Sequence, residues 1–465
     1  MNTNIFQSRP VPGADDIREI LVRRVDQQKQ ATGIVVGLIE PGGRRVVPYG
    51  HIAKGDPRAI DGDTIFEIGS VSKVFTSLLL ADMVHRKEVG LDDPAVNYLP
   101  AHVRMPERSG TSITLRDLST HRSGLPPMPG NLFAKMARRK DPDGLHVGYG
   151  VDDLYEFLSS YSLPRDPGSE FEYSNLGAGL LGHLLGYRAG TDYEGLVRNR
   201  ITQPLGMPDT GITLSPSMKL RIATGHNAML VPVADSDLPT PLAGAGALRS
   251  SANDMLTFLE AFLGYTESPL APAMNAMFET RRPAGRTEMG LAWFIYSPDG
   301  REIAVHNGGT GGFRSYVGYD PKKRIGVVVL SNAFTHIGVD DIGIHLLNPK
   351  APLANPEPPK EHTEIPIDPK LLDNYIGRYQ VTAHLVLEIT RSGDCLFAQG
   401  VAQLPQNRPG DPTGLPKFEL FAEGEDRFFA RVTDLQITFE TGPDGRAAGL
   451  ILHKAGRDMP GVRLS

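Results

Sequence analysis

Cysteine is almost absent from this sequence, which contains only Cys395 among its 465 residues. One cysteine excludes an intrachain disulfide and a metal site built from several cysteines. None of the 13 histidines occurs in a His-Glu-x-x-His pattern, and none is paired with Cys395 in the sequence. We therefore expect no catalytic metal and no cofactor. Cys395 lies in a segment expected to be a strand, where it would be a small buried side chain.

Blocks of positive charge and long hydrophobic runs are also missing. The net charge is −6, and lysine and arginine form no cluster that would attract nucleic acid or an anionic membrane. The longest strongly apolar run, 74–84, includes Thr76, Ser77 and Asp82 and is too short to cross a bilayer. The expected partner is therefore a small-molecule or peptide-like substrate, without nucleic acid or a membrane span, and a homo-oligomer stays open.

The first 13 residues lack the basic segment followed by an apolar stretch that marks a protein for export. On this pattern the expected location is the cytoplasm. A precursor from which an export signal had been removed would instead place the protein in the periplasm.

The length of the chain exceeds what one hydrophobic core supports, so the sequence predicts two or three domains. Seven prolines lie among charged residues between positions 349 and 369, a composition typical of an extended linker. We expect a catalytic domain over residues 1–348, the linker over 349–369 and a second domain over 370–465.

Strand patterns occur at both ends of the first domain, and residues from Ser70 to about Gly264 follow a helical, loop-rich pattern. One antiparallel sheet built from both ends, with the helical part packed beside it, gives an α+β domain. The strands are expected at 33–40, 44–49, 289–296, 302–306, 313–319 and 326–331.

The second domain contains short alternating segments separated by turns. This spacing predicts a small all-β domain, either a barrel or a sandwich. It would either cap the cleft of the first domain and restrict the size of its substrates or only stabilise an oligomer. The strands are expected at 385–390, 418–421, 428–432, 436–440 and 449–453.

Ser70 and Lys73 are the first pair of residues that suggests chemistry. Ser70 follows a strand-like segment and precedes a hydrophobic helix, so it is expected at the helix N-terminus, where free N–H groups favour negative charge. Lys73 is three residues further on and projects from the same helical face. A serine hydroxyl is a weak nucleophile unless a neighbouring base takes its proton.

Lys73 could be that base only if burial lowers its pKa. A decrease from about 10.4 to about 7 corresponds to roughly 4–5 kcal/mol, which a second group sharing the proton would make easier. Ser-x-x-Lys is by itself too short to distinguish a catalytic pair from a chance occurrence, so further features are needed.

A second candidate motif runs from Phe171 through Tyr173 to Asn175. Tyr173 would share or relay the proton, and Asn175 would donate its amide to a substrate carbonyl while it orients Lys73. The alternative is structural: Asn175 would cap the helix expected at 176–185, and Tyr173 would only pack.

A third motif, 305–314, follows an apolar strand and contains His306, Gly308 and Gly309. Its small residues would let a substrate lie against the backbone. The backbone N–H of Gly309 would then complete an oxyanion hole with the N–H of Ser70. The alternative is a glycine-rich hairpin with an exposed histidine.

Two other stretches carry no predicted chemistry. Residues 118–126, which include His121 and Gly124, are typical of a helix end and a turn, and the residues alone indicate no role. Residues 177–182 match the glycine pattern of dinucleotide-binding loops but lack the preceding strand and the acidic residue that such loops need. These glycines are expected to let a helix pack tightly.

Taken in order, Ser70-x-x-Lys73, Tyr173-x-Asn175 and His306-x-Gly308 resemble the three motifs of the penicillin-recognising serine hydrolases. The Tyr-x-Asn form is similar to the branch of class C β-lactamases, serine D-alanyl-D-alanine carboxypeptidases, D-aminopeptidases and β-lactamase-like esterases. The similarity covers roughly residues 15–345. The tail from about Tyr375 resembles the lipocalin-like β-domain often fused to such hydrolases.

The resemblance implies a β-lactamase/transpeptidase-like α+β fold, with the site between the sheet and the helical part, followed by a lipocalin-like barrel. It also implies an acyl-enzyme on Ser70, with Lys73 and Tyr173 as the acid/base pair and Asn175, His306, Gly308 and Gly309 around the substrate.

The third motif departs from that of the class C β-lactamases, which usually carry Lys-Thr-Gly where this chain has His-Asn-Gly at 306–308. A largely neutral histidine attracts a substrate carboxylate less than a lysine does. Arg314 is the substrate-binding candidate that would compensate. In addition, Pro127 and Met128 follow Gly124-Leu-Pro126, where the β-lactamases carry a glutamine that holds the substrate amide.

The main hypothesis is thus a serine hydrolase that cleaves β-lactam amides or related esters and D-amino-acid amides through an acyl-enzyme. A carboxylesterase, D-aminopeptidase or DD-carboxypeptidase of the same family is the alternative. A penicillin-binding protein that is acylated without turnover is the alternative outside the enzymes.

Overall fold

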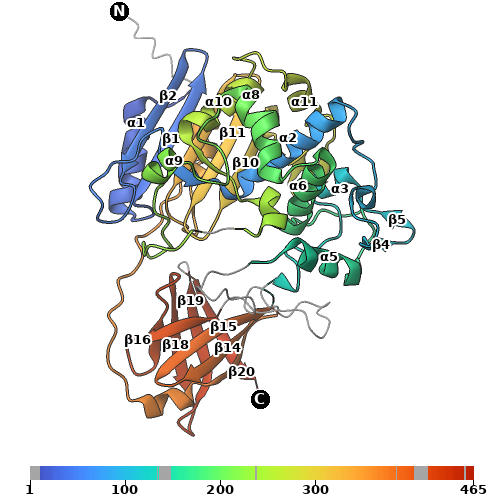
Figure 1. Cartoon of the computed structure of the whole chain (residues 1–465). Helices are drawn as coiled ribbons and strands as arrows, with labels where there is room; N and C mark the ends of the chain where they lie inside the picture. Colours follow the sequence, from blue (N-terminus) through green and yellow to red (C-terminus); the bar gives the residue numbers. More distant parts are fainter. Residues whose placement is uncertain are drawn as a thin grey trace, which may run out of the picture. The chain divides into compact units, whose positions relative to one another are not determined.

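The computed structural model describes residues 11–132, 135, 148–235, 238–383, 385–402, 417–454 and 457–464. The chain forms two compact units (Figure 1). The first contains residues up to His226 and from Pro232 to Pro356, and the second contains Asn227–Val231 and residues from Glu357 onward. Each unit is described by itself.

The first unit is built on an eight-stranded antiparallel sheet in the order β2-β1-β12-β11-β10-β9-β8-β7. It combines the N-terminal strands with strands that follow residue 280, so distant parts of the chain lie side by side (Figure 1). The strands are β1 Gly33–Glu40, β2 Gly43–Gly50, β7 Arg282–Ala284, β8 Thr287–Met289, β9 Phe294–Tyr296, β10 Ile303–Gly309, β11 Arg314–Asp320 and β12 Ile325–Ser331.

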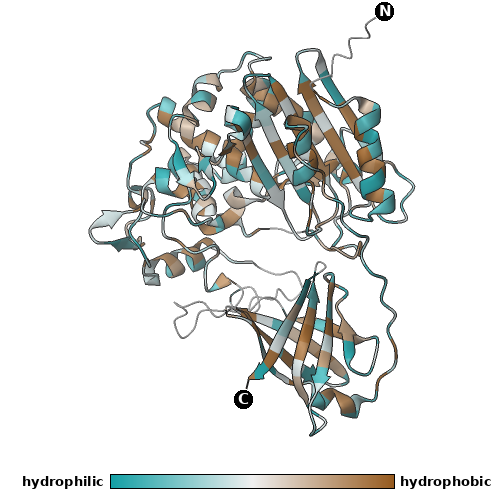
Figure 2. Cartoon of the chain, turned by 180° about the vertical axis from the view of Figure 1, so that it is seen from behind, coloured by the Kyte–Doolittle hydropathy of each residue, from teal (hydrophilic) through white to brown (hydrophobic). Residues whose placement is uncertain are grey.

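Helices cover both faces of this sheet, which explains the continuous hydrophobic runs of β1 and β12. On one face, Gly37 of β1 packs against Leu256 of α10 (Ala252–Phe262). On the other, Tyr316 of β11 packs against Gly343 of α12 (Asp340–Leu347). Figure 2 shows the hydrophobic colouring along the central strands.

The helical part surrounds α2 (Ser72–His85), which is buried from Ser72 to Met83. Helix α2 packs against α6 (Asn175–Ala189), α11 (Ala271–Ala276) and the 3₁₀ segment η5 (Thr240–Ala245). The helical part also includes α3 (Leu115–Ser119) and α5 (Val151–Ser160).

The expected strand 289–296 is wrong as a single element. The structure has two short strands, β8 and β9, separated by a turn in which the Gly290 N–H donates to the Trp293 carbonyl over 2.9 Å. Ala292 in this turn has a φ of 62°, and Trp293 is fully buried. The apolar residues of the turn are buried by packing, and their hydrophobicity therefore resembles that of a strand.

The second unit is a closed antiparallel barrel in which β13 pairs with both β14 and β20. Alternate residues point inward, as Ile437 and Phe439 do on β18, and large side chains such as Tyr379 and Phe428 fill the interior. The strands are β13 Gly377–Thr382, β14 Leu385–Ser392, β15 Cys395–Ala402, β16 Phe418–Ala422, β17 Arg427–Phe429, β18 Leu435–Thr441, β19 Ala447–Lys454 and β20 Arg457–Leu464.

Two expectations for the barrel need correction. Strand β17 ends at Phe429, before the expected Val432, which is 55% exposed. Cys395 is partly exposed because it opens strand β15 next to a turn, so it is not the buried side chain expected.

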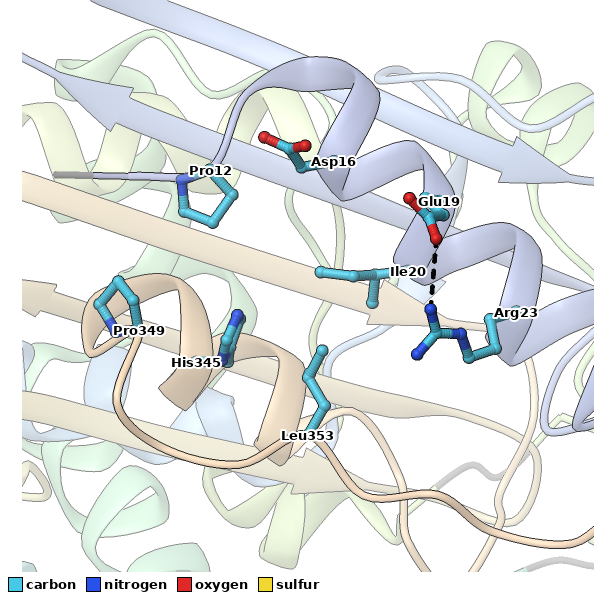
Figure 3. Close-up of a pocket in the computed structure, with 8 residues that line it drawn as sticks. All are labelled: Pro12, Asp16, Glu19, Ile20, Arg23, His345, Pro349 and Leu353. Atoms are coloured by element: carbon cyan, nitrogen blue, oxygen red, sulfur yellow. Dashed lines mark hydrogen bonds and ion pairs between the residues drawn. The ribbon is translucent and has the colours of Figure 1, made fainter. Parts of the chain in front are cut away.

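No helix in the described ranges is both long and apolar enough to span a membrane. A surface cavity of about 380 Å³ lies between α1 (Ala14–Val22) and the chain around the end of α12, lined by residues such as Asp16, Glu19 and His345 (Figure 3). Glu19 forms an ion pair with Arg23 there over 3.3 Å. None of the residues of the three sequence motifs lines this cavity.

Gly343 provides a test of the packing between α12 and the sheet. A Cβ at this position would lie 2.1 Å from Cδ1 of Tyr316. Although alanine normally favours a helix over glycine, Gly343→Ala should destabilise the protein by about 1–3 kcal/mol through overpacking. Urea unfolding of the variant measures this.

The matched control is Gly177→Ala on α6, where the added Cβ makes no contact closer than 3.4 Å. This variant should be neutral or slightly stabilising. An equal loss of stability in both variants would contradict the packing of α12 described here.

Candidate active site

Ser70 lies where strand β3 (Ile65–Glu67) turns into α2 through one 3₁₀ turn, Gly69–Val71. Gly69 has a φ of 51°, and a Cβ there would come within 2.8 Å of the Gly309 nitrogen. Only glycine fits both the left-handed backbone and this close approach. Ser70 is partly exposed at the first turn, where helix N–H groups lack intrahelical acceptors.

Lys73 is 99% buried beneath Ser70, and its Nζ has three hydrogen-bond partners. The Nζ donates to Ser70 Oγ over 2.9 Å, to Asn175 Oδ1 over 2.7 Å and to the Ala245 carbonyl over 2.6 Å. All three acceptors are uncharged. Burial lowers the pKa of Lys73 to about 7. A substantial fraction of Lys73 is therefore neutral at physiological pH and able to take the Ser70 proton.

The Tyr173 ring also packs against Lys73, and its centre lies 4.8 Å from Nζ. Burial raises the pKa of Tyr173 to about 12, and a hydrogen bond with Ser70 opposes this increase. The phenol therefore keeps its proton at neutral pH. In this geometry neutral Lys73 can act as a base, and Tyr173 can donate or relay a proton but is not a free phenolate.

Asn175 is the first residue of α6 and is not its cap, so the structural alternative considered for it is wrong. Ser174 caps the helix, because its Oγ accepts the Gly177 N–H over 2.9 Å. The Asn175 side chain is therefore available to accept a hydrogen bond from Lys73.

His306 lies on β10 and is buried, so the exposed histidine considered in the alternative for the third motif is wrong. Its Nδ1–H donates to the Asn307 carbonyl over 2.7 Å. Burial lowers the pKa of His306 to about 3, and the nearby charge of Lys73 adds to this decrease. His306 is therefore neutral, and the third motif brings no positive charge to Ser70.

Gly308 and Gly309 bring β10 against the turn that carries Ser70. A Cβ at Gly308 would lie 2.1 Å from the Ile68 carbonyl, and the Gly309 backbone lies against Gly69. The Gly309 amide and the Ser70 turn are therefore neighbours. This closeness is what an oxyanion hole made of the two amides requires.

Arg314 lies on β11 opposite Gly309, outside the immediate surroundings of Lys73. Its Nε donates to the Thr335 carbonyl over 3.1 Å, and its guanidinium stacks on Phe334 at 4.1 Å. Its Nη1 would be 3.1 Å from a Cβ at Gly309. The structure thus places a cation beside the third motif, although not on it.

Three groups around the site were given no role in the sequence analysis. The Ala245 carbonyl is a backbone group, so only the run of small residues around it could have indicated a close approach. Asp340 accepts a hydrogen bond from the Asn307 side chain. His121 stacks on Tyr173 with ring centres 4.3 Å apart. Within the described ranges no group of His, Cys, Asp and Glu is arranged to hold a metal ion.

Two of the glycines in the stretch 177–182, Gly179 and Gly182, serve helix packing, as expected. A Cβ at Gly179 would lie 2.7 Å from Cα of Leu242, and one at Gly182 would lie 3.0 Å from Cα of Gly244. Helix α6 therefore lies directly against η5, and these glycines form no loop for a dinucleotide.

Comparison with known proteins gives two family matches. Residues 19–347 match the β-lactamase family, and residues 361–462 match a domain of unknown function, DUF3471. The D-alanyl-D-alanine-carboxypeptidase/endopeptidase AmpH of Escherichia coli is 30% identical over 386 residues, which cover 76% of this chain and 95% of that protein.

Two of the similar solved structures illustrate the likeness. The class C β-lactamase from Rhodobacter sphaeroides has 28% identity and a TM-score of 0.58, over 69% of this chain and 93% of its own. The octameric penicillin-binding protein homologue from Pyrococcus abyssi covers 97% of this chain and 100% of its own, with a TM-score of 0.61 and 22% identity. The second likeness concerns the fold, including the barrel.

The pKa of Lys73 predicts how the reactivity of Ser70 depends on pH. The second-order rate of Ser70 modification by a sulfonyl fluoride should increase as Lys73 loses its proton, with a midpoint near pH 7. Below that midpoint the rate should decrease about tenfold per pH unit, because only neutral Lys73 accepts the proton. Intact-mass measurements from pH 5 to 9 provide the rates.

Lys73→Met is the control, since it keeps a long apolar side chain and removes the base. It should react slowly and show no midpoint near pH 7. A midpoint near pH 10 in the unchanged protein would contradict the effect of burial on Lys73.

Proposed function

The chain belongs to the β-lactamase family of serine hydrolases, and on this premise we propose that it cleaves carbonyl substrates in two steps through an acyl-enzyme on Ser70. The observation that carries the proposal is the buried Lys73 Nζ, held 2.9 Å from Ser70 Oγ by two further uncharged acceptors. A base held this way is ready to take the serine proton before any substrate arrives.

In the first step neutral Lys73 takes the proton of Ser70, and Ser70 Oγ forms a bond to the substrate carbonyl carbon. The negative charge moves to the carbonyl oxygen, which the N–H groups of Ser70 and Gly309 would stabilise. The bond to the leaving group then breaks, and the leaving group takes a proton from Lys73 by way of Tyr173. A water molecule releases the acid by the reverse sequence and restores Ser70.

The preferred substrates in this proposal are esters and D-amino-acid amides without a carboxylate next to the bond that breaks. Neutral His306 gives a substrate carboxylate no charge to bind. Asp340, hydrogen-bonded to Asn307, adds a negative group at the same motif. A carboxylate bound there would experience repulsion, whereas a neutral ester or an internal amide would not.

The second candidate is cleavage of β-lactams or of peptides ending in D-alanine, both of which carry a carboxylate. Arg314 favours it, because its Nη1 reaches the surroundings of Gly309. The similarity to the carboxypeptidase/endopeptidase AmpH also supports it. A penicillin-binding protein that is acylated and stays so is the third outcome.

Turnover of a neutral p-nitrophenyl ester and of a chromogenic cephalosporin separates these candidates. We expect the ester to have the higher kcat/KM, and Ser70→Ala to lower both rates by at least about a thousandfold. Ser217→Ala, at an exposed serine of α9 (Pro216–Arg221), is the matched control and should keep full activity.

Each alternative outcome has a defined meaning. Faster turnover of the cephalosporin supports the second candidate, and a stable adduct by intact mass without turnover supports the third. Full activity of Ser70→Ala would contradict the mechanism itself.

Asp340→Asn tests the proposed repulsion of carboxylates. Removing the charge while keeping a hydrogen-bonding side chain leaves Arg314 less compensated, so kcat/KM for the cephalosporin should increase about three- to tenfold. The ester should be unaffected. Asp299→Asn, at an exposed residue of the same unit, is the control. An equal change for both substrates would show that Asp340 does not select by charge.

A further inference from the structure

His121 lies two residues after the end of helix α3 and is 99% buried. Its φ of 55° puts a non-glycine residue in the left-handed region, which costs free energy and persists only where surrounding contacts impose it. The stretch 118–126 gave no role from the sequence, so this backbone conformation needs an explanation from its neighbours.

The neighbours of His121 are the residues on either side of Tyr173. The backbone carbonyl of His121 accepts the Glu172 N–H over 2.8 Å, and its Nδ1 accepts the Ser174 N–H over 3.1 Å. Between these two hydrogen bonds the imidazole lies on the Tyr173 ring, with centres 4.3 Å apart and planes inclined by 33°. His121 therefore holds Tyr173 by both flanking amides and by its ring.

The left-handed backbone makes this arrangement possible, because it lets one residue present its carbonyl and its side chain to the same short segment. The hydrogen bond from Ser174 also fixes the protonation state of the imidazole. Nδ1 can accept the Ser174 N–H only when it carries no proton, so His121 is neutral with its proton on Nε2. Burial and the charge of Lys73 lower the pKa of His121 well below its usual value, which agrees with this assignment.

The remaining contacts of His121 are apolar or electrostatic. Phe171 packs edge-on at 6.0 Å, and the Nε2–H is buried without a hydrogen-bond partner among the residues that the structure describes. A buried imidazole whose role was only to stabilise the fold would be expected to form hydrogen bonds with both nitrogens. Here the nitrogen that is used is the one that holds the Tyr173 segment.

We propose that His121 is a positioning residue that fixes the Tyr173 hydroxyl beside Ser70 for proton transfer. The inference rests on the proposed function, since it assigns Tyr173 a proton to donate or relay. Without His121 the phenol would keep its chemistry but lose its orientation, and a displacement of about 1 Å can cost about a hundredfold in rate.

The test is a double-mutant cycle of His121→Ala and Tyr173→Phe, with ester turnover as the readout. His121→Ala should lower kcat about a hundredfold and change KM by no more than about twofold. In the Tyr173→Phe background, where the ring remains but the hydroxyl is gone, the same substitution should lower kcat by less than about threefold. Independent effects would multiply instead.

His121→Asn is the conservative variant. Asparagine tolerates a positive φ, and its Oδ1 can accept the Ser174 N–H. It should recover part of the lost kcat, and it replaces His121→Ala in the cycle if the alanine variant does not fold. Thermal unfolding is measured for every variant.

His183 supplies the matched control. It is also a histidine in contact with a tyrosine, since its Nε2 forms a hydrogen bond with the Tyr155 hydroxyl over 2.8 Å, but it lies on α6 away from Ser70. His183→Ala should change kcat only a fewfold, and its effect should multiply with that of Tyr173→Phe.

Two results would overturn the inference. One is a cycle in which the effects of His121 and Tyr173 multiply, and the other is unchanged kcat in a folded His121→Ala variant. Both can occur while Ser70→Ala is inactive, so they leave the proposed function standing. Full activity of Ser70→Ala would instead overturn the proposed function.

Discussion

The site depends on one costly arrangement, the burial of the Lys73 ammonium among acceptors that carry no charge. Ser70, Asn175 and the Ala245 carbonyl satisfy its hydrogen bonds. They do not compensate its charge, so the pKa decreases to about 7. Relative to an ordinary lysine, that decrease corresponds to a shift of about 5 kcal/mol in the protonation equilibrium toward the neutral form. A carboxylate in place of Asn175 would stabilise the charged form of Lys73 and raise its pKa again.

Holding this arrangement requires close backbone packing on two sides of α2. On one side Gly179 and Gly182 let α6 lie against η5, which brings Asn175 and the Ala245 carbonyl to the same nitrogen. On the other side Gly69 and Gly308 let β10 approach the turn of Ser70. The glycines at 177–182 resemble a nucleotide-binding motif in sequence, yet the physical effect of Gly179 and Gly182 is to place two hydrogen-bond acceptors beside Lys73.

Much of the fold and the site could be predicted because the responsible signals are local. The strands expected at 33–40 and 326–331 coincide with the buried strands β1 and β12 to within one residue. Ser70 and Lys73 are brought together by a single helical turn. The sequence patterns failed where packing between distant segments determines the bounds of an element or its capping residue. The expected strand 289–296 is interrupted at Ala292. Strands β13 and β20 were not expected. Helix α6 is capped by Ser174, one residue before the expected cap. Ala245 contributes a backbone carbonyl, which every residue has, so only the run of small residues around it could have indicated a close approach there.

Strand alternation on β10 gives the two faces of the third motif different surroundings. Successive side chains point to opposite faces. His306 and Gly308 face the Ser70 turn and the helical part, where neutrality and close approach are needed. Asn307 and Gly309 face the other way, toward Asp340 and Phe334. The charges of Asp340 and Arg314 therefore lie on the other face of the strand from the neutral surroundings of Lys73. The strand pleat thereby keeps these charged side chains apart from the buried Lys73, whose low pKa depends on uncharged surroundings.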